Sequence, residues 1–171
     1  GIAEGQGTRP VCSPEFVAYP SLLDACVGFM PPVGGTPSVT VRRDVFEKVG
    51  GFCARKINAE DVDLWLRLGG EKGFVRITSP PVFQQSYLEI SASRDMRAQV
   101  AGVDLVMDQE RAQNYPGGRF FRERRLKIIT AMARSVSFDC LLVGDFANGL
   151  GLYRRSFSLQ LAQRRVRYLL G

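Results

Sequence analysis

The spacing of apolar residues divides this chain into two parts, and that division most limits the folds it can adopt. Residues 20–91 hold short apolar stretches, some alternating as strands do and some with helical periodicity. From Ala92 onward the periodicity is helical. We therefore expect an α/β fold in residues 1–91, followed by a helical extension over residues 92–171.

Turn-forming residues set the bounds of the elements expected in the first part. Residues 1–19 begin with a run rich in glycine and polar side chains, which indicates a loop. Pro-Pro and Gly-Gly pairs separate the stretches that follow. We expect helices over residues 20–29, 43–49 and 58–68, and strands over residues 38–41, 74–78 and 82–87. Because so few strands cover little core, this part is typical of a portion of a larger sheet.

The second part predicts four helices and carries the positive charge of the chain. The helices are expected over residues 93–112, 119–136, 139–147 and 152–169. Residues 119–171 hold eleven Lys and Arg against three acidic residues, a net charge of +8. The other 118 residues hold twelve basic and fourteen acidic groups, a net charge of −2. The basic surplus therefore belongs to the extension.

Three interpretations fit a basic helical extension. The first is a solvated face over an apolar stripe. The second is attachment to an anionic membrane surface, where basic side chains are attracted to acidic headgroups. The third is nucleic-acid binding, but the chain has no nucleic-acid-binding motif, so we expect no nucleic-acid partner.

The chain has no histidine, and this narrows the chemistry open to it. Neither a Ser-His nor a Cys-His nucleophilic pair can form, so acid–base catalysis near neutral pH falls to carboxylates. The four cysteines are far apart and are expected to be reduced thiols of a cytoplasmic protein rather than zinc ligands: Cys12, Cys26, Cys53 and Cys140. No phosphate-binding loop or dinucleotide fingerprint is present.

The helix expected over residues 58–68 concentrates the acidic residues of the first part. Asn58 is a suitable N-cap, and three acids follow in the first turns, where the helix dipole favours negative charge. Leu64, Trp65 and Leu68 share a face with Asp61 at helical spacing. Asp63 and Arg67, four apart, are expected to form a surface ion pair. Alone, this pattern equally fits an ordinary amphipathic helix.

The wider context of this helix carries a resemblance. In order, the chain has Ser38-Val39-Thr40-Val41-Arg42-Arg43, a short helix, Val49-Gly50-Gly51-Phe52, and Glu60-Asp61-Val62-Asp63-Leu64-Trp65-Leu66-Arg67. This succession resembles the C-terminal half of the catalytic domain in glycosyltransferase family 2, the inverting enzymes with a GT-A fold. The resemblance implies that residues 1–91 form a partial GT-A-like mixed sheet.

The resemblance also implies roles for named residues. Asp61 would be the general base that deprotonates an acceptor hydroxyl, with Glu60 beside it. Substrate contacts would come from Asp63, Trp65, Arg67 and Ser38. The substrates would be a nucleotide-sugar and a glycan or lipid-linked acceptor. The family binds a divalent metal, Mn²⁺ or Mg²⁺, through a D-x-D motif in its nucleotide-binding half, and no metal ligand is assigned in this chain.

Two departures from the family pattern shape the functional expectation. The nucleotide-binding half, roughly the first hundred residues of the family domain, has no counterpart. Gln84 and Ser86 stand where the family often has Arg and His, if Ser91 is aligned with the family's serine. We therefore expect a truncated glycosyltransferase-like protein that is inactive as an isolated chain. The alternative is a non-catalytic helical module for membrane or protein association.

A truncated sheet leaves an unpaired edge and an uncovered apolar face. Such surfaces recruit a second chain, so we expect a homo-oligomer. The chain has no apolar run long enough for a membrane span and no leader, so we expect a cytoplasmic protein, peripheral to the inner face of the membrane.

Overall fold

A computed structural model describes residues 13–25, 36–81, 95–165 and 168. Its elements follow in the order β1 (Glu15–Ser21), α1 (Leu22–Ala25), the short 3₁₀ turn η1 (Thr36–Ser38), α2 (Arg43–Lys48), α3 (Glu60–Leu68), β2 (Lys72–Ser79), α4 (Met96–Arg111), α5 (Gly118–Leu142) and α6 (Phe146–Ala162). The fold therefore mixes α and β elements and ends in a helical part, as expected.

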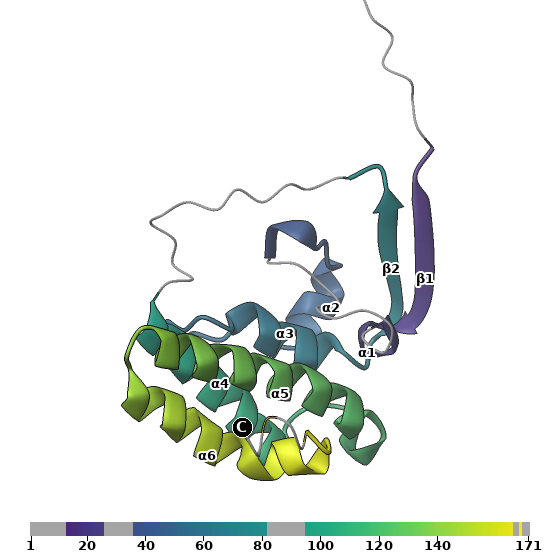
Figure 1. The fold of residues 1–171 in the computed structure, drawn as a ribbon. Helices are drawn as coiled ribbons and strands as arrows, with labels where there is room; N and C mark the ends of the chain where they lie inside the picture. Colours follow the sequence, from purple (N-terminus) through teal and green to yellow (C-terminus); the bar gives the residue numbers. More distant parts are fainter. Residues whose placement is uncertain (1–12, 26–35, 82–94, 166–167, 169–171) are drawn as a thin grey trace, which may run out of the picture.

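The sheet consists of two antiparallel strands, β1 and β2, which stand to one side of the long helices (Figure 1). Tyr19 lies opposite Phe74, and Ser21 lies opposite Lys72. The strand expected over 74–78 is confirmed, whereas the loop expected through residue 19 is wrong from Glu15 onward. Pro20 fits β1 because an outer strand has one edge that donates no ladder bonds.

The strand expected over residues 38–41 does not form. Thr36–Ser38 make a 3₁₀ turn, and the next four residues pair with no described strand. Val39 and Val41 are instead partly buried against the hydrophobic core. The alternation of apolar and polar residues over 38–41 therefore reflects how an irregular segment packs on the core, rather than hydrogen bonding to a neighbouring strand. The strand expected over 82–87 lies outside the described residues.

Three long helices make up the second part of the chain as far as the structure describes it. Helix α4 confirms the helix expected over 93–112 within the described residues. The helices expected over 119–136 and 139–147 are wrong as separate elements, because α5 runs on to Leu142. The break falls at Gly144, whose φ of 80° suits glycine. Asp145 then caps α6 by accepting a hydrogen bond from the Asn148 N–H at 3.2 Å.

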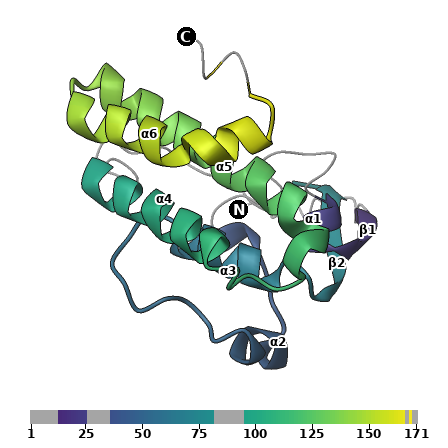
Figure 2. The ribbon, with the colours of Figure 1, turned by 90° about the horizontal axis from the view of Figure 1, so that it is seen from below.

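One hydrophobic core links the two parts of the chain. Its buried members come from α1, α3, α4, α5 and α6, among them Leu23, Leu64, Leu66, Val103, Met107, Leu126, Ile129 and Leu152. Seen from below, α5 and α6 lie side by side, with α4 along them and α2 on the side away from α6 (Figure 2). The core crosses the boundary at residues 91 and 92, so both parts pack as a unit.

Helix α1 docks the N-terminal strand onto the rest of the molecule. Leu23 is fully buried, and its N–H donates to the Gly69 carbonyl at 3.3 Å. Asp24 forms an ion pair with Arg124 of α5 at 2.5 Å. A Cβ on Gly69 would lie 2.6 Å from the Leu23 side chain, so glycine permits this contact. The start of the described chain is thus held by α5 and by the end of α3.

Of the four cysteines, the structure describes two, and both are free thiols. Cys140 is buried in the core, and burial raises its thiol pKa. Cys12 and Cys26 lie outside the described residues. Among the described helices, none combines the length and apolar content that a bilayer span requires.

Candidate active site at the start of helix α3

The position of α3 is fixed by its packing on α4. The Asn58 N–H donates to the Ala98 carbonyl at 3.0 Å. A Cβ on Gly102 would lie 2.4 Å from the Asn58 oxygen, so glycine allows the two backbones to approach. The expected helix is confirmed from Glu60 to Leu68, but its N-cap is Ala59 rather than Asn58, and no side chain caps it. The start of α3 is thus positioned by backbone contacts with α4, without a side-chain cap.

Asp61, the expected general base, lies half-buried in the first turn of α3. The Val62 N–H donates to its Oδ1 at 2.7 Å. Burial raises the carboxyl pKa above its ordinary value, and the neighbouring Glu60 charge adds to this rise. Within the described residues no cation pairs with Asp61. A carboxylate of this kind is more basic than an exposed one.

Glu60 lies beside Asp61 but faces its own backbone. Its Oε2 accepts a hydrogen bond from the Ala59 N–H at 3.1 Å. This contact gives an acceptor to the backbone N–H of the N-cap residue, Ala59. Glu60 therefore supports the start of the helix and contributes negative charge next to Asp61.

Asp63 is buried and pairs with the half-buried Arg67, rather than forming the expected surface pair. The Asp63 side chain is 7% exposed, and the Arg67 Nη2 lies 2.8 Å from its Oδ2. The Tyr115 hydroxyl donates to Asp63 Oδ1 at 2.9 Å. Burial, followed by the Asp63 charge, raises the Tyr115 pKa. Both carboxylate oxygens are thus engaged. Whether either residue also contacts substrate stays a prediction.

Arg67 also joins α3 to the Val49-Gly50-Gly51-Phe52 turn. Its Nη1 donates to the Val49 carbonyl at the end of α2. Gly50 and Gly51 both have positive φ, 83° and 63°, which favours glycine. The ring of Phe52 meets Phe46 edge to face, with centroids 5.6 Å apart. The two segments that carry the family resemblance are therefore in direct contact.

An open hollow of about 480 Å³ lies along α3. It is lined by Thr36, Val39, Val41, Arg43, Phe46, Glu47, Phe52, Leu64 and Trp65. Trp65 follows Asp61 by one helical turn, so the base candidate lies near this hollow without lining it. Ser38 is exposed and is not among the lining residues, although its neighbours Val39 and Thr36 are. The structure thus brings Trp65 to the hollow and leaves Ser38 beside it.

The described residues do not fit a divalent metal. They contain no group of three or more His, Cys, Asp or Glu side chains suited to hold one. In Asp61-Val62-Asp63, the only D-x-D segment of the chain, both Asp63 oxygens already accept hydrogen bonds from Arg67 and Tyr115. Gln84, Ser86 and Ser91 lie outside the described residues. No chemical step is therefore assigned to a metal here.

Sequence reasoning missed Tyr115 and the aromatic pair of Phe46 and Phe52. Tyr115 lies in the turn between α4 and α5, and 52 positions separate it from Asp63. No local spacing predicts such a contact.

The chain was compared with protein-family models, with curated proteins and with solved structures, and none of the three comparisons finds a match.

Proposed function

We propose that this chain is the base-bearing portion of an inverting glycosyltransferase similar to family 2, with Asp61 as general base. One observation carries the proposal. Asp61 is a half-buried carboxylate with a raised pKa and no cationic partner among the described residues. Structural carboxylates of this protein differ, since Asp63 and Glu110 are each paired with an arginine. An unpaired, partly desolvated carboxylate suits proton abstraction.

The chemistry follows from the position of Asp61. Its carboxylate takes the proton of an acceptor hydroxyl as that oxygen attacks the anomeric carbon of the donor sugar. The bond from that carbon to the nucleoside diphosphate breaks, and the configuration inverts. Glu60 keeps negative charge beside the base, which favours the protonated product state of Asp61. The nucleotide-sugar donor would be held by residues that this chain does not supply.

The hollow along α3 is the proposed acceptor site. Phe46 and Phe52 line it and present aromatic surface, on which a sugar ring can pack, while Trp65, which is 7% exposed, lines it from the core. Arg43 and Glu47 supply polar groups to the same hollow. Because Trp65 is the only tryptophan of the chain, its fluorescence reports on this hollow alone. Glycan titration should change that fluorescence, and a Phe52→Ala variant should weaken the response.

A transfer assay tests the proposed base. The complete product of the natural reading frame is incubated with UDP- and GDP-sugars, Mn²⁺ or Mg²⁺, and glycan or polyprenyl-linked acceptors. Asp61→Asn should lower kcat by about 10²- to 10⁴-fold. Donor binding, measured by calorimetry, should not change. Asp108→Asn, an exposed carboxylate on α4, is the matched control and should retain activity.

Two results would reject this function. One is full transfer activity in Asp61→Asn. The other is the absence of transfer from every donor by the complete product. For the isolated 171-residue chain, calorimetry with UDP- and GDP-sugars should show no binding, because the family's nucleotide-binding half has no counterpart in this sequence.

The second candidate is a non-catalytic module that attaches to an anionic membrane. It is favoured by exposed apolar side chains along α6, namely Phe146, Leu150, Phe157 and Leu161. Exposed arginines, Arg154, Arg164 and Arg165, accompany them. A partly apolar and basic helix of this kind suits the membrane interface. Cytoplasmic location at the inner membrane face is part of this proposal.

Liposome sedimentation distinguishes this candidate from a purely catalytic one. Vesicles with acidic lipids should bind the chain at low salt and release it as salt rises. Leu150→Glu with Phe157→Glu should abolish binding. Equal binding to neutral vesicles would contradict the electrostatic attachment.

We also propose that the chain self-associates through its sheet. Phe16, Val17, Val75 and Ile77 of the hairpin are exposed, between 43% and 65%. Apolar strands with free edges tend to pair with a second copy. Sedimentation velocity should show a dimer or larger species, and Phe16→Lys should shift it to monomer.

A further inference from the structure

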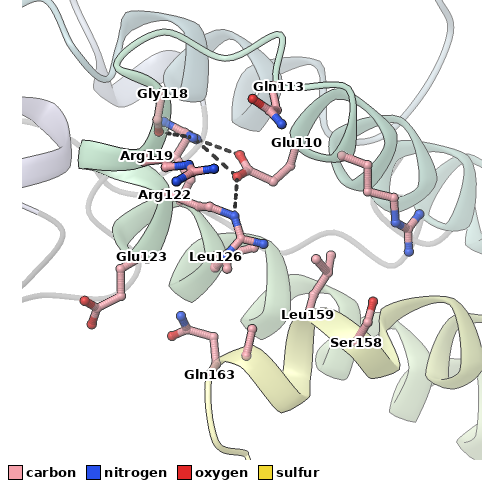
Figure 3. Close-up of a pocket in the computed structure, with 13 residues that line it drawn as sticks. Glu110, Gln113, Gly118, Arg119, Arg122, Glu123, Leu126, Ser158, Leu159 and Gln163 are labelled. Carbon is pink, nitrogen blue, oxygen red and sulfur yellow. Dashed lines mark hydrogen bonds and ion pairs between the residues drawn. The ribbon is translucent and has the colours of Figure 1, made fainter.

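A second hollow, of about 700 Å³, lies among the three long helices and away from α3. It is bounded by the end of α4, the start of α5 and the last turns of α6 (Figure 3). Glu110 and Gln113 reach it from α4 and the turn after it. Arg119 and Arg122 come from α5, and Gln163 comes from the end of α6. Its size is in the range of small-molecule sites.

The acidic groups of this hollow each have a cationic partner. Glu110 is buried, and Arg125 donates to it through Nε at 2.6 Å and through Nη2 at 3.3 Å. Arg125 also donates to the Gly118 carbonyl at 2.8 Å, which holds the start of α5. Glu123 pairs with Lys127 at 3.3 Å. Glu110 and Glu123 are thus paired with Arg125 and Lys127. Neither carboxylate pairs with Arg119, so the hollow has little unpaired negative charge.

Two arginines at the start of α5 carry more positive charge than the nearby carboxylates neutralise, because Arg122 shares Glu110 with Arg125. Arg119 is exposed and has no ion pair or hydrogen-bond partner in the described parts of the chain. Arg122 lies 3.8 Å from Glu110 Oε1, an oxygen that Arg125 already binds. The first turn of α5 contains no acidic residue, and its N-cap, Gly117, offers no side chain. Positive side chains at the positive end of a helix repel it, so this arrangement suits an added anion.

The remaining lining residues suit an organic body attached to that anion. Leu126, Leu159 and Ala162 give apolar surface, while Gln113, Gln163 and Ser158 give hydrogen-bonding groups. We propose that this hollow binds the phosphate monoester of a small molecule. The phosphate lies on Arg119 and Arg122, whose guanidinium groups match phosphate oxygens in pairs, and the organic body lies against Leu159 and Gln163. This site does not depend on the transferase function of α3.

Binding of adenosine 5′-monophosphate, without metal, tests the site. In ¹H–¹⁵N NMR spectra, AMP should shift the side-chain Nε–H signals of Arg119 and Arg122 and the amide of Gln163. Adenosine should cause no such shifts at the arginines. Inorganic phosphate should shift the arginines but bind more weakly than AMP. Affinity for AMP should fall as salt rises.

Matched variants assign the binding to the hollow. Arg119→Gln with Arg122→Gln should weaken AMP binding about tenfold or more, since charge-assisted hydrogen bonds are lost. Arg55→Gln with Arg97→Gln removes the same charge from exposed positions elsewhere and should leave the affinity unchanged. Thermal melts of all variants check that they fold.

The same phosphate chemistry occurs on a lipid headgroup, and a second arm separates the two sources. Vesicles that contain phosphatidic acid, a lipid phosphate monoester, are compared with free AMP. If the double variant Arg119→Gln with Arg122→Gln weakens AMP binding, the ligand is a soluble phosphate monoester. If that variant weakens only vesicle binding, the ligand is a lipid. No binding to either probe overturns the proposal, as does equal weakening by the control pair.

Discussion

The first turns of α3 and α5 carry charges of opposite sign at the positive end of the helix dipole. Helix α3 carries three acidic residues in its first turn, and the Glu60 carboxylate accepts a backbone N–H within its own segment. Helix α5 carries none, and instead presents Arg119 and Arg122. Its start is held by the buried Glu110–Arg125 pair. The comparison indicates that acidic residues of α3 itself offset the positive end of its helix dipole. The start of α5 has no such residue, and its arginines add positive charge, which the proposed phosphate ligand would offset.

The largest expected effect tests whether α3 depends on its buried pair. Asp63→Ala leaves the Arg67 guanidinium and the Tyr115 hydroxyl without their acceptor. We expect a loss of about 3–5 kcal/mol in the free energy of unfolding, measured by urea denaturation with circular dichroism. Asp44→Ala removes an exposed partner of Arg42, where water screens the pair, and should cost far less. Similar losses in both variants would contradict the structural role of Asp63.

The next effect tests the anchoring of α3 on α4. In Gly102→Ala the new methyl group would meet the Asn58 carbonyl oxygen at 2.4 Å, so a backbone must move. We expect a loss of about 1–3 kcal/mol in unfolding free energy. Gly151→Ala in α6 meets only the flexible Arg155 side chain and should be neutral or stabilising. Equal melting temperatures for both variants would show that the close approach is unimportant.

A charge reversal gives α5 the arrangement that α3 already has. Arg119→Glu places an acid in the first turn of α5 and should raise the unfolding free energy by about 0.3–1 kcal/mol at low salt. Arg154→Glu, in the middle of α6, should give no such gain. Thermal melts at low and high salt measure both, and the gain should shrink with salt. Stabilisation that persists at high salt would point to a cause other than the helix dipole.

The smallest effect concerns Asp61 and its pH dependence. A carboxyl whose folded pKa is raised binds its proton more tightly in the folded state. It therefore supports folding below its unfolded pKa, and that support is lost as pH rises through the folded pKa. Asp61→Asn should accordingly be slightly more stable than the natural chain at pH 7. This gain should vanish in acid. Denaturation curves across that pH range should reveal it, and a stability loss at pH 7 would reverse the sign of our assignment.

The helices were largely predictable because their signals are local. The periodicity of residues 96–111 and the acidic start of α3 lie within single elements. The error within α5 arose because Ser137 and Phe138 were taken as a gap. In the structure Ser137 is buried, and its hydroxyl donates to the Gly149 carbonyl at 2.8 Å. This contact with α6, rather than local helix propensity, explains why a polar serine lies on the buried side of α5.

The pairings between distant residues could not be predicted. Strand β1 finds its partner in β2, more than fifty positions later, and its own residues include Pro20. The Tyr115 contact with Asp63 is of the same kind. Such contacts depend on how the helices pack, which the spacing of residues along one element does not encode. The base candidate Asp61 was indicated by its motif, but its burial comes from that packing.

The docking of α1 has a consequence for the order in which the chain acquires its structure during synthesis. Leu23 and Asp24 emerge from the ribosome before their partners Gly69 and Arg124. The chain must therefore be translated through Arg124 before α1 can reach its native place. Until then Leu22 and Leu23 remain open to non-native association, a hazard for nascent chains with exposed apolar segments. Chaperone binding to ribosome-bound fragments should accordingly fall once translation has passed α5.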